Sequence, residues 1–274
     1  MDKRPIVAVI LAAGKGKRMK SDLPKVLHKL GGKPMVEYVV ETAKKVGVER
    51  IILVVGHKRE KAQKLLKHLD VEFVIQEEPL GTGHALLQTK GLLSNFDGDI
   101  LVLCGDMPLL KSSTVEKLLK EHRTKKAVAT VLTAMVEEPS GYGRIIRNKD
   151  GMVQKIVEDK DASADEKKVK EINTGTFCFD SHSLFSVLDE ISPDNKQREY
   201  YLTDALELLR KQNLPIWAVI APNPQEGLGI NSQEELERME EILLVENPAL
   251  RQVQDGERSR TTKGGAESSK QTTS

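Results

Sequence analysis

The stretch IVAVILAAGKGKRM, residues 6–19, decides the fold class of this chain. Its first six residues form a continuous apolar run, as expected for a short strand that is covered on both faces. A glycine-rich basic loop follows this run without a break. Ligands of open α/β sheets bind at the carboxyl ends of strands. The stretch therefore predicts a first strand that leads into an anion-binding loop.

Strand-like and helix-like segments alternate after this loop. The pattern predicts helices over 34–47, 58–69, 85–93 and 112–123, the last one N-capped by Ser112, and strands over 51–55, 71–75, 100–104 and 127–136. The second half predicts a hairpin of strands 143–147 and 152–157, a charged loop over 159–170, strands over 172–179 and 216–221, and helices over 181–190, 202–211 and 232–246. This succession indicates an α/β fold with a Rossmann-like, mostly parallel mixed sheet and helices on both faces.

Composition and charge are those of an ordinary globular protein. The 274 residues carry a formal net charge of +1, which gives no reason to expect a nucleic-acid or membrane partner. No signal peptide or membrane-length apolar run is visible, so a cytoplasmic location is the expectation. Cys104 and Cys178 lie in apolar runs and are expected to be buried thiols rather than a disulfide. The polar composition of residues 251–274 predicts a disordered tail.

The first loop combines two features that bind phosphate. Gly14 and Gly16 allow positive φ and let backbone N–H groups approach an anion closely. Cationic donors are present at Lys15, Lys17, Arg18 and Lys25. A triphosphate needs this combination of backbone, arginine and lysine donors. The pattern GxxxxGK[ST] is absent and position 19 is methionine, so neither a P-loop nor a complete dinucleotide fingerprint is present. A solvated basic turn is the alternative.

Two more polar loops follow predicted strands. In QEEPLGTGH, residues 76–84, the amide of Gln76 offers a donor and an acceptor to a pyrimidine edge, and the Gly81–Thr82 pair permits close backbone approach. Asp106 comes directly after an apolar strand, the expected place for a metal ligand. An ordinary glycine turn and a turn or N-cap aspartate are the alternatives. Three such loops at one sheet edge favour a common site.

The second half adds polar groups at strand margins. Gly143, Glu158 and Asn173 lie where they could present polar groups to a sugar, although Glu158 could equally be plain surface charge. Asn231 begins the last helical region, where either it or Ser232 could serve as the N-cap.

Nine motifs occur in the order and spacing of one family: LAAGKGKRM, SDLPKVLH, QEEPLGTGHA, GDMPLL, GYGRIIR, VEDKDA, EINTG, NKQREYYLTD and GIN. Over residues 5–246, the chain resembles the N-terminal uridylyltransferase domain of the bacterial bifunctional UDP-N-acetylglucosamine pyrophosphorylase and glucosamine-1-phosphate acetyltransferase family. GYGRI, EINTG and EYYLTD are the most specific motifs. The resemblance implies a nucleotide-diphospho-sugar transferase fold with a nucleotidyltransferase domain over 1–250. Lys17 stands where threonine is common, and Cys104 where an aromatic or small residue is frequent.

The resemblance also implies a role for each candidate site residue. Uridine would be held by Leu11, Ala12, Ala13, Gly14, Gln76, Gly81 and Thr82. Arg18 and Lys25 would be catalytic and neutralise the phosphates. Asp106 and Asn231 would hold the cofactor Mg²⁺, and Asn231, like Lys25, would also contact substrate. The amino sugar would contact Gly143, Glu158 and Asn173.

The implied reaction is uridylyl transfer from UTP to N-acetylglucosamine 1-phosphate, which gives UDP-N-acetylglucosamine for cell-wall peptidoglycan and releases pyrophosphate. The attacking phosphate has a second pKa of about 6, so catalysis needs positioning and charge neutralisation rather than a base. The family's C-terminal β-helix is absent from the sequence, so neither acetyl transfer nor a β-helix trimer is expected, and a monomer is compatible with this. The rivals are a nucleotidyltransferase for another nucleotide or sugar phosphate and a non-catalytic nucleotide-sugar-binding module.

Overall fold

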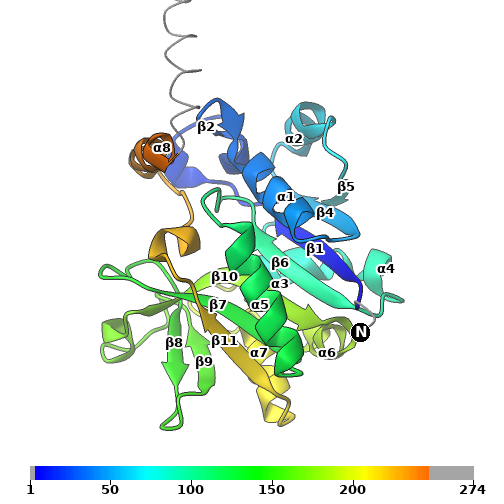
Figure 1. The fold of residues 1–274 in the computed structure, drawn as a ribbon, viewed down its shortest axis with the longest axis vertical. Helices are drawn as coiled ribbons and strands as arrows, with labels where there is room; N and C mark the ends of the chain where they lie inside the picture. The colour runs from blue at the N-terminus through cyan, green and yellow to red at the C-terminus, as the bar shows by residue number, and fades with distance from the viewer. Residues whose placement is uncertain (1–3, 247–274) are drawn as a thin grey trace, which may run out of the picture.

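In the computed structural model, which describes residues 4–246, buried apolar strands form the centre of the molecule (Figure 1). Seven strands lie in the order β11-β7-β10-β6-β1-β4-β5. Their bounds are Ile6–Leu11 (β1), Arg50–Val55 (β4), Glu72–Ile75 (β5), Asp99–Cys104 (β6), Ala129–Met135 (β7), Glu171–Asp180 (β10) and Ile216–Ile220 (β11). Of these, β10 alone runs against the others. The predicted mostly parallel mixed sheet is confirmed.

A hairpin extends the sheet beside β10. Strands β8 (Arg144–Arg147) and β9 (Val153–Val157) are antiparallel, and Arg144 pairs with Ile172 of β10. The turn between them closes through a hydrogen bond from Gly151 N to Asn148 O of 3.0 Å. The expected hairpin is therefore present, and it projects from one half of the sheet (Figure 1).

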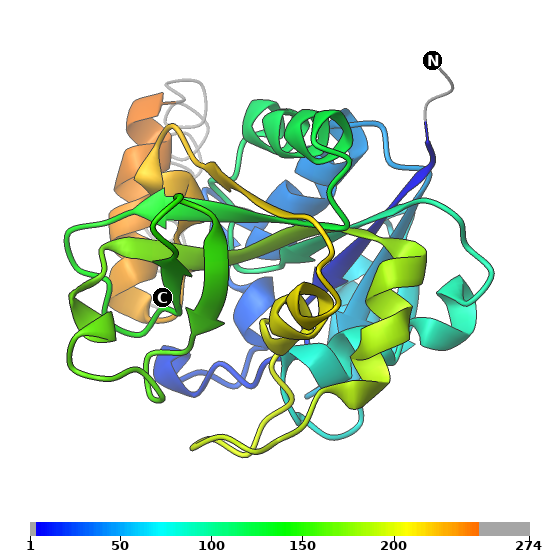
Figure 2. The same ribbon diagram turned by 90° about the horizontal axis from the view of Figure 1, so that it is seen from below.

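Helices cover both faces of the sheet because alternate strand residues point to opposite sides. Ile6, Ala8 and Ile10 of β1 pack into one core, while Val7 and Val9 pack into the other. The first core is closed by α1 (Met35–Lys45), α2 (Arg59–Leu66) and α5 (Ser112–Thr124), and the second by α3 (Thr82–Leu87), α6 (Ser181–Val187) and α7 (Asp204–Lys211). Figure 2 shows α1 and α5 on one side of the sheet and α6 and α7 on the other.

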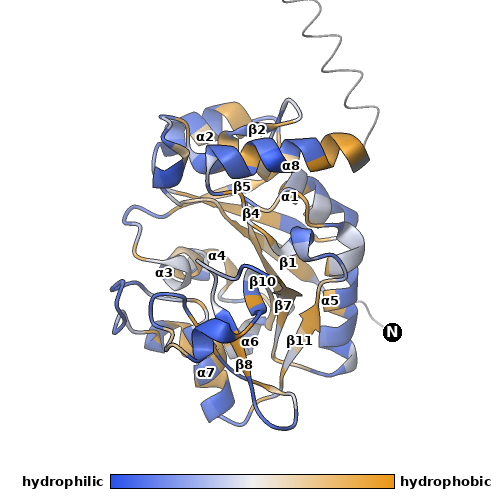
Figure 3. Ribbon diagram, turned by 90° about the vertical axis from the view of Figure 1, so that its left-hand side faces the viewer, coloured by the Kyte–Doolittle hydropathy of each residue, from blue (hydrophilic) through white to orange (hydrophobic). Residues whose placement is uncertain are grey.

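The last helix, α8 (Gln233–Glu246), packs against the first loop of the chain. Leu236, Met239 and Leu243 of α8 share a small apolar cluster with Met19, which is 3% exposed. The short strands β2 (Lys29–Leu30) and β3 (Lys33–Pro34) lie beside this helix (Figure 1). Figure 3 shows the contrast between the apolar strands inside and the polar outer surfaces of the helices.

Two helix predictions were wrong in detail. The segment 85–93 divides into α3 and α4 (Lys90–Leu93), because the buried Thr89 hydroxyl donates to Leu86 O at 2.7 Å and competes with the helical pattern. Helix α5 begins at Ser112, so the residue at the cap position is Lys111, whose backbone is extended and makes no side-chain cap.

Cys104 and Cys178 are both free thiols, as expected, but only Cys178 is buried and Cys104 is partly exposed. The predicted tail over 251–274 lies outside the described residues. Within residues 4–246, no helix is both long enough and apolar enough to cross a membrane.

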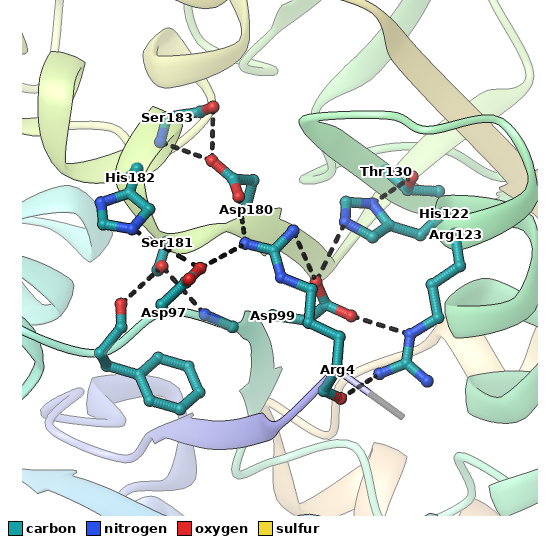
Figure 4. Close-up of polar contacts among 12 residues, drawn as sticks. Arg4, Asp97, Asp99, His122, Arg123, Thr130, Asp180, Ser181, His182 and Ser183 are labelled. Carbon is teal, nitrogen blue, oxygen red and sulfur yellow. Dashed lines mark hydrogen bonds and ion pairs between the residues drawn. The ribbon is translucent and has the colours of Figure 1, made fainter. Parts of the chain in front are cut away.

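An ionic network braces the amino-terminal edge of the sheet (Figure 4). The buried carboxylate of Asp99 accepts a hydrogen bond of 2.9 Å from Arg123 Nε and lies 3.5 Å from Arg4 Nη1. Polar atoms of Asp99, His122 and Cys178 lie within 4.8 Å of one another. The two guanidinium groups already neutralise this carboxylate, which disfavours a metal ion there. The network is structural and lies at the strand ends opposite the loops described next.

Candidate active site

The carboxyl ends of β1, β5 and β6 bring the predicted loops together. Gly105 N donates to Leu11 O at 2.9 Å, and Gln76 N donates to Val55 O at 2.8 Å. Ala12 N also donates to Val54 O at 2.9 Å, so the loops after β1, β5 and β6 are held at one sheet edge through the end of β4. A cavity of ≈ 510 Å³ opens between them.

Most residues predicted for the nucleotide side line this first cavity. They are Leu11, Ala12, Ala13, Gly14, Lys25, Gln76, Gly81, Thr82 and Asp106. Lys15, Lys17 and Glu199 also line it, and Glu199 was not singled out from the sequence because it belongs to a loop more than a hundred residues away. Arg18 is exposed and is not part of the lining.

The charge of Arg18 nevertheless acts on Tyr142, which lines the second cavity of the site. Burial raises the pKa of Tyr142 to about 12, and the positive charge of Arg18 opposes this shift. The catalytic role of Arg18 stays a prediction.

The glycines of the first loop serve different purposes. Gly16 has φ +57°, and a Cβ there would lie 2.6 Å from Lys25 Cβ, so glycine lets the lysine pack against the loop. Gly14 is not in the left-handed region and has open space around it, so the expected need for positive φ applies to Gly16 alone. The space at Gly14 remains available to a ligand.

The side chain of Gln76 is held in one orientation. Its amide nitrogen lies 3.0 Å from Gly81 O and 3.0 Å from His84 Nδ1. Because Gly81 O can only accept, the nitrogen must point there. The amide oxygen is left as the acceptor of this side chain.

Lys25 joins the two predicted metal ligands. Its ammonium forms an ion pair with Asp106 and donates to Asn231 Oδ1 at 2.7 Å. Gly229 makes room for this carboxylate, since a Cβ there would lie 3.1 Å from Asp106 Oδ2. One carboxylate and one amide oxygen thus already converge on a cation. This hard oxygen donor set fits Mg²⁺.

Asn231 is free for this role because Ser232 caps the helix. Ser232 Oγ accepts from Glu235 N at 3.1 Å, and Glu235 Oε2 accepts from Asn231 N at 2.6 Å. This arrangement is a variant of the capping box, in which the Glu235 carboxylate accepts from the residue before the N-cap rather than from Ser232 itself. Of the two N-cap candidates, the structure selects Ser232.

A second cavity of 190 Å³ adjoins the first and contains the predicted sugar residues. Gly143, Glu158 and Asn173 line it. Strand β10 carries an irregularity between Asn173 and Phe177, where Gly175 has φ +81°. A Cβ at Gly175 would lie 2.7 Å from Cys104 Sγ, so the bulge allows β10 to pass closely behind the site.

Glu158 is not a plain surface charge. Burial raises the pKa of its carboxyl group to about 7, and a hydrogen bond of 3.3 Å from Thr203 Oγ1 partly offsets this shift. Thr203, which the sequence did not single out, is 5% exposed and lines the same cavity.

The EYYLTD loop connects the two cavities. Gly83 N donates to Tyr200 O at 2.8 Å, and Leu202 N donates to Thr82 Oγ1 at 3.0 Å. At Gly81, with φ +114°, a Cβ would lie 2.5 Å from Tyr200 O. The glycines of the 79–83 segment therefore serve packing against this distant loop as well as ligand access.

Comparison with known proteins defines the class of protein to which the chain belongs. The chain belongs to the family of MobA-like NTP transferase domains, whose model matches residues 8–212. The bifunctional protein GlmU of Bacillus licheniformis is 49% identical over 256 residues, which cover 93% of this chain and 55% of that protein. The bifunctional protein GlmU of Bacillus thuringiensis (strain Al Hakam) is 50% identical over 236 residues, or 86% of this chain and 51% of that one. The chain thus spans about half the length of the curated relatives it matches.

A solved structure shares the fold. UDP-glucose pyrophosphorylase complexed with UDP-glucose has a TM-score of 0.70 and 21% identity, and the match covers 89% of this chain and 100% of that one. The expected nucleotide-diphospho-sugar transferase fold and the family resemblance are therefore confirmed.

Proposed function

We propose that this chain is a Mg²⁺-dependent uridylyltransferase that converts UTP and N-acetylglucosamine 1-phosphate into UDP-N-acetylglucosamine and pyrophosphate. One observation carries the proposal: the two cavities share a wall made of Leu11, Thr82 and Cys104. A nucleotide in the first and a sugar phosphate in the second would meet at this wall. The solved structural relative is a pyrophosphorylase bound to a UDP-sugar, which supports this assignment.

The first cavity suits a uracil nucleotide. The Gln76 oxygen accepts hydrogen bonds, so it complements the N3–H of uracil and opposes the N3 acceptor of cytosine. Thymine carries the same N3–H group, and discrimination against it must come from the fit around its methyl group and deoxyribose.

The chemistry relies on charge neutralisation. The sugar phosphate has a second pKa of about 6, so its oxygen is ready to attack the α-phosphorus of UTP without a base. The bond from the α-phosphorus to the bridging oxygen breaks, and pyrophosphate leaves. Lys15, Lys17 and Lys25 place positive charge in the first cavity. Mg²⁺, when held by Asp106 and Asn231, would neutralise further phosphate charge.

A substrate panel tests the proposal. Pyrophosphate release is measured with each of the four NTPs and dTTP, in the presence of Mg²⁺, against N-acetylglucosamine, glucosamine and glucose 1-phosphates. UTP with N-acetylglucosamine 1-phosphate is expected to give the highest kcat/KM. A preference for glucose 1-phosphate or dTTP would reassign the substrates, whereas binding without turnover would identify a non-catalytic module.

The pH dependence of sugar-phosphate binding tests the role of Glu158. Its carboxyl pKa of about 7 means that ionisation is incomplete near neutrality. The ionised form accepts hydrogen bonds from sugar hydroxyls, so KM for the sugar phosphate is expected to fall as pH rises through about 7. The KM for UTP should lack this step, and Glu158→Gln should remove it from the sugar-phosphate profile.

The raised pKa of Glu158 has the opposite consequence for the stability of the fold, which should decrease with pH while sugar-phosphate binding improves. Because the folded state raises the pKa, protonated Glu158 favours folding, and this contribution is lost as pH rises through about 7.

The Glu158→Gln variant also decides the origin of the KM profile. If its KM for the sugar phosphate changed with pH as in the wild type, another group would cause the pH dependence.

A further inference from the structure

Arg144 is a buried arginine beside the sugar cavity, although its side chain does not line that cavity. It is 2% exposed and begins strand β8. Its guanidinium donates to Tyr142 O and, at 3.0 Å, to Asp159 Oδ1. A buried charge is costly even when paired, and an apolar side chain often stabilises such a position as well. The presence of arginine at this position therefore indicates that its fixed hydrogen-bonding geometry is required there.

The two acceptors of Arg144 belong to two neighbouring segments, each of which supplies residues to the wall of the sugar cavity. Tyr142 belongs to the 141–143 loop, all of which lines the cavity. Asp159 directly follows Glu158. A single guanidinium group thus connects the loop before β8 to the end of β9.

The spacing between these segments is tight. A Cβ at Gly143 would lie 3.3 Å from both carboxylate oxygens of Glu158. Gly143 O also accepts from Asn173 N at 2.8 Å, which ties the third predicted sugar residue to the same loop. A small shift of the loop would therefore disturb all three sugar-side residues together.

The loop also reaches the surroundings of Asp106. Tyr142 Oη donates to Gly229 O at 3.5 Å, and Gly229 lies against Asp106. The segment that Arg144 anchors therefore extends from the sugar cavity to the proposed metal ligand.

We propose that Arg144 is a positioning residue that sets the distance between the 141–143 loop and Glu158, and thereby the affinity for the sugar phosphate. This inference rests on the proposed function. Lysine would keep the charge but lacks the planar fork that serves two acceptors at once. Arg144→Lys should therefore lose the connection between the segments while retaining a buried cation.

The test compares Arg144→Lys with Arg147→Lys in the full chain. Arg147 lies on the same strand and donates to Glu171 through Nε at 2.7 Å, but Arg147 and Glu171 line neither of the two cavities of the site. Arg144→Lys is expected to raise KM for N-acetylglucosamine 1-phosphate about tenfold and to change KM for UTP less than about twofold. Arg147→Lys should leave both values within about twofold of wild type.

Asp159→Asn provides a second route if Arg144→Lys does not fold. The Asp159 side chain is 30% exposed, so its replacement should be tolerated, and it weakens the same connection. It should reproduce the selective KM increase. Parallel increases in both KM values, or an equal effect in Arg147→Lys, would overturn the positioning role. Absence of wild-type turnover would overturn the proposed function, and this inference with it, whereas normal turnover without a KM difference would overturn this inference alone.

Discussion

Asp106→Asn is expected to lower kcat about 10³-fold, equivalent to ~4 kcal/mol of transition-state stabilisation, while the fold remains intact. Asparagine keeps the shape of the side chain but removes its full negative charge. Asp106 provides the only carboxylate of the proposed Mg²⁺ pair, since Asn231 contributes a neutral amide oxygen. The Mg²⁺ concentration that gives half-maximal rate should therefore rise strongly as well.

A matched variant tests whether the loss of rate requires removal of the charge at the site or follows from removal of any aspartate charge. Asp22 forms an ion pair with Lys58 at 2.8 Å on the surface, so Asp22→Asn removes a comparable aspartate–lysine pair outside both cavities. Rates are measured against Mg²⁺ concentration for wild type and both variants, with thermal unfolding as the folding control. A folded Asp106→Asn protein with a near-normal rate and an unshifted Mg²⁺ curve would show that Asp106 is only a turn residue and not a metal ligand.

The sequence predicts the position of Asp106 well because the evidence is local. An apolar strand ends at Cys104, and the next acidic residue must lie at the sheet edge. The same reasoning places the first loop and Gln76, since each directly follows a strand. The carboxyl ends of parallel strands meet at one edge, so strand order is not needed to group these residues.

Residues that act through distant partners are not predictable in this way. Lys25 and Asn231 are separated by 206 positions, and their contact depends on how α8 returns to the first loop through Met19. Thr203 gains its role only when the EYYLTD loop reaches Glu158. Family motifs marked these segments as important, but nothing local in the sequence states which groups they contact.

The same local sequence signal can be correct at one helix and wrong at another. A serine before an apolar pattern predicts an N-cap, and Ser232 fulfils that prediction. Ser112 does not, because the extended backbone of Lys111 already occupies the cap position and Lys111 N donates to the distant Glu226 carboxylate at 3.3 Å. Tertiary contacts of the preceding residue thus decide where the helix starts.

Lys25→Met is expected to produce two effects of opposite direction. Turnover should fall about 10²- to 10³-fold, because a charge-assisted contact to the reacting phosphates is lost. At the same time, the protein without nucleotide should bind a divalent cation more tightly than wild type. The reason is that the Lys25 ammonium itself binds the oxygens of Asp106 and Asn231, so a metal ion must compete with it.

The change in metal affinity shows whether Lys25 competes with the metal ion for the oxygens of Asp106 and Asn231 or helps to hold the ion there. Methionine has a similar length but no charge, so the two oxygens lose their partner and become available to a metal ion. Mn²⁺ binding, measured by calorimetry in the absence of UTP, should tighten about tenfold, as expected when a charged hydrogen bond of ~1.5 kcal/mol no longer has to be broken. Lys58→Met, which frees the surface carboxylate of Asp22, serves as the control and should leave Mn²⁺ affinity at the site unchanged.

Unchanged or weaker binding by folded Lys25→Met would mean that Lys25 does not hold the metal ligands in the resting protein. Tighter binding combined with lost turnover would mean that Lys25 leaves these oxygens when Mg²⁺ and UTP arrive, and that the same ammonium then serves the phosphates.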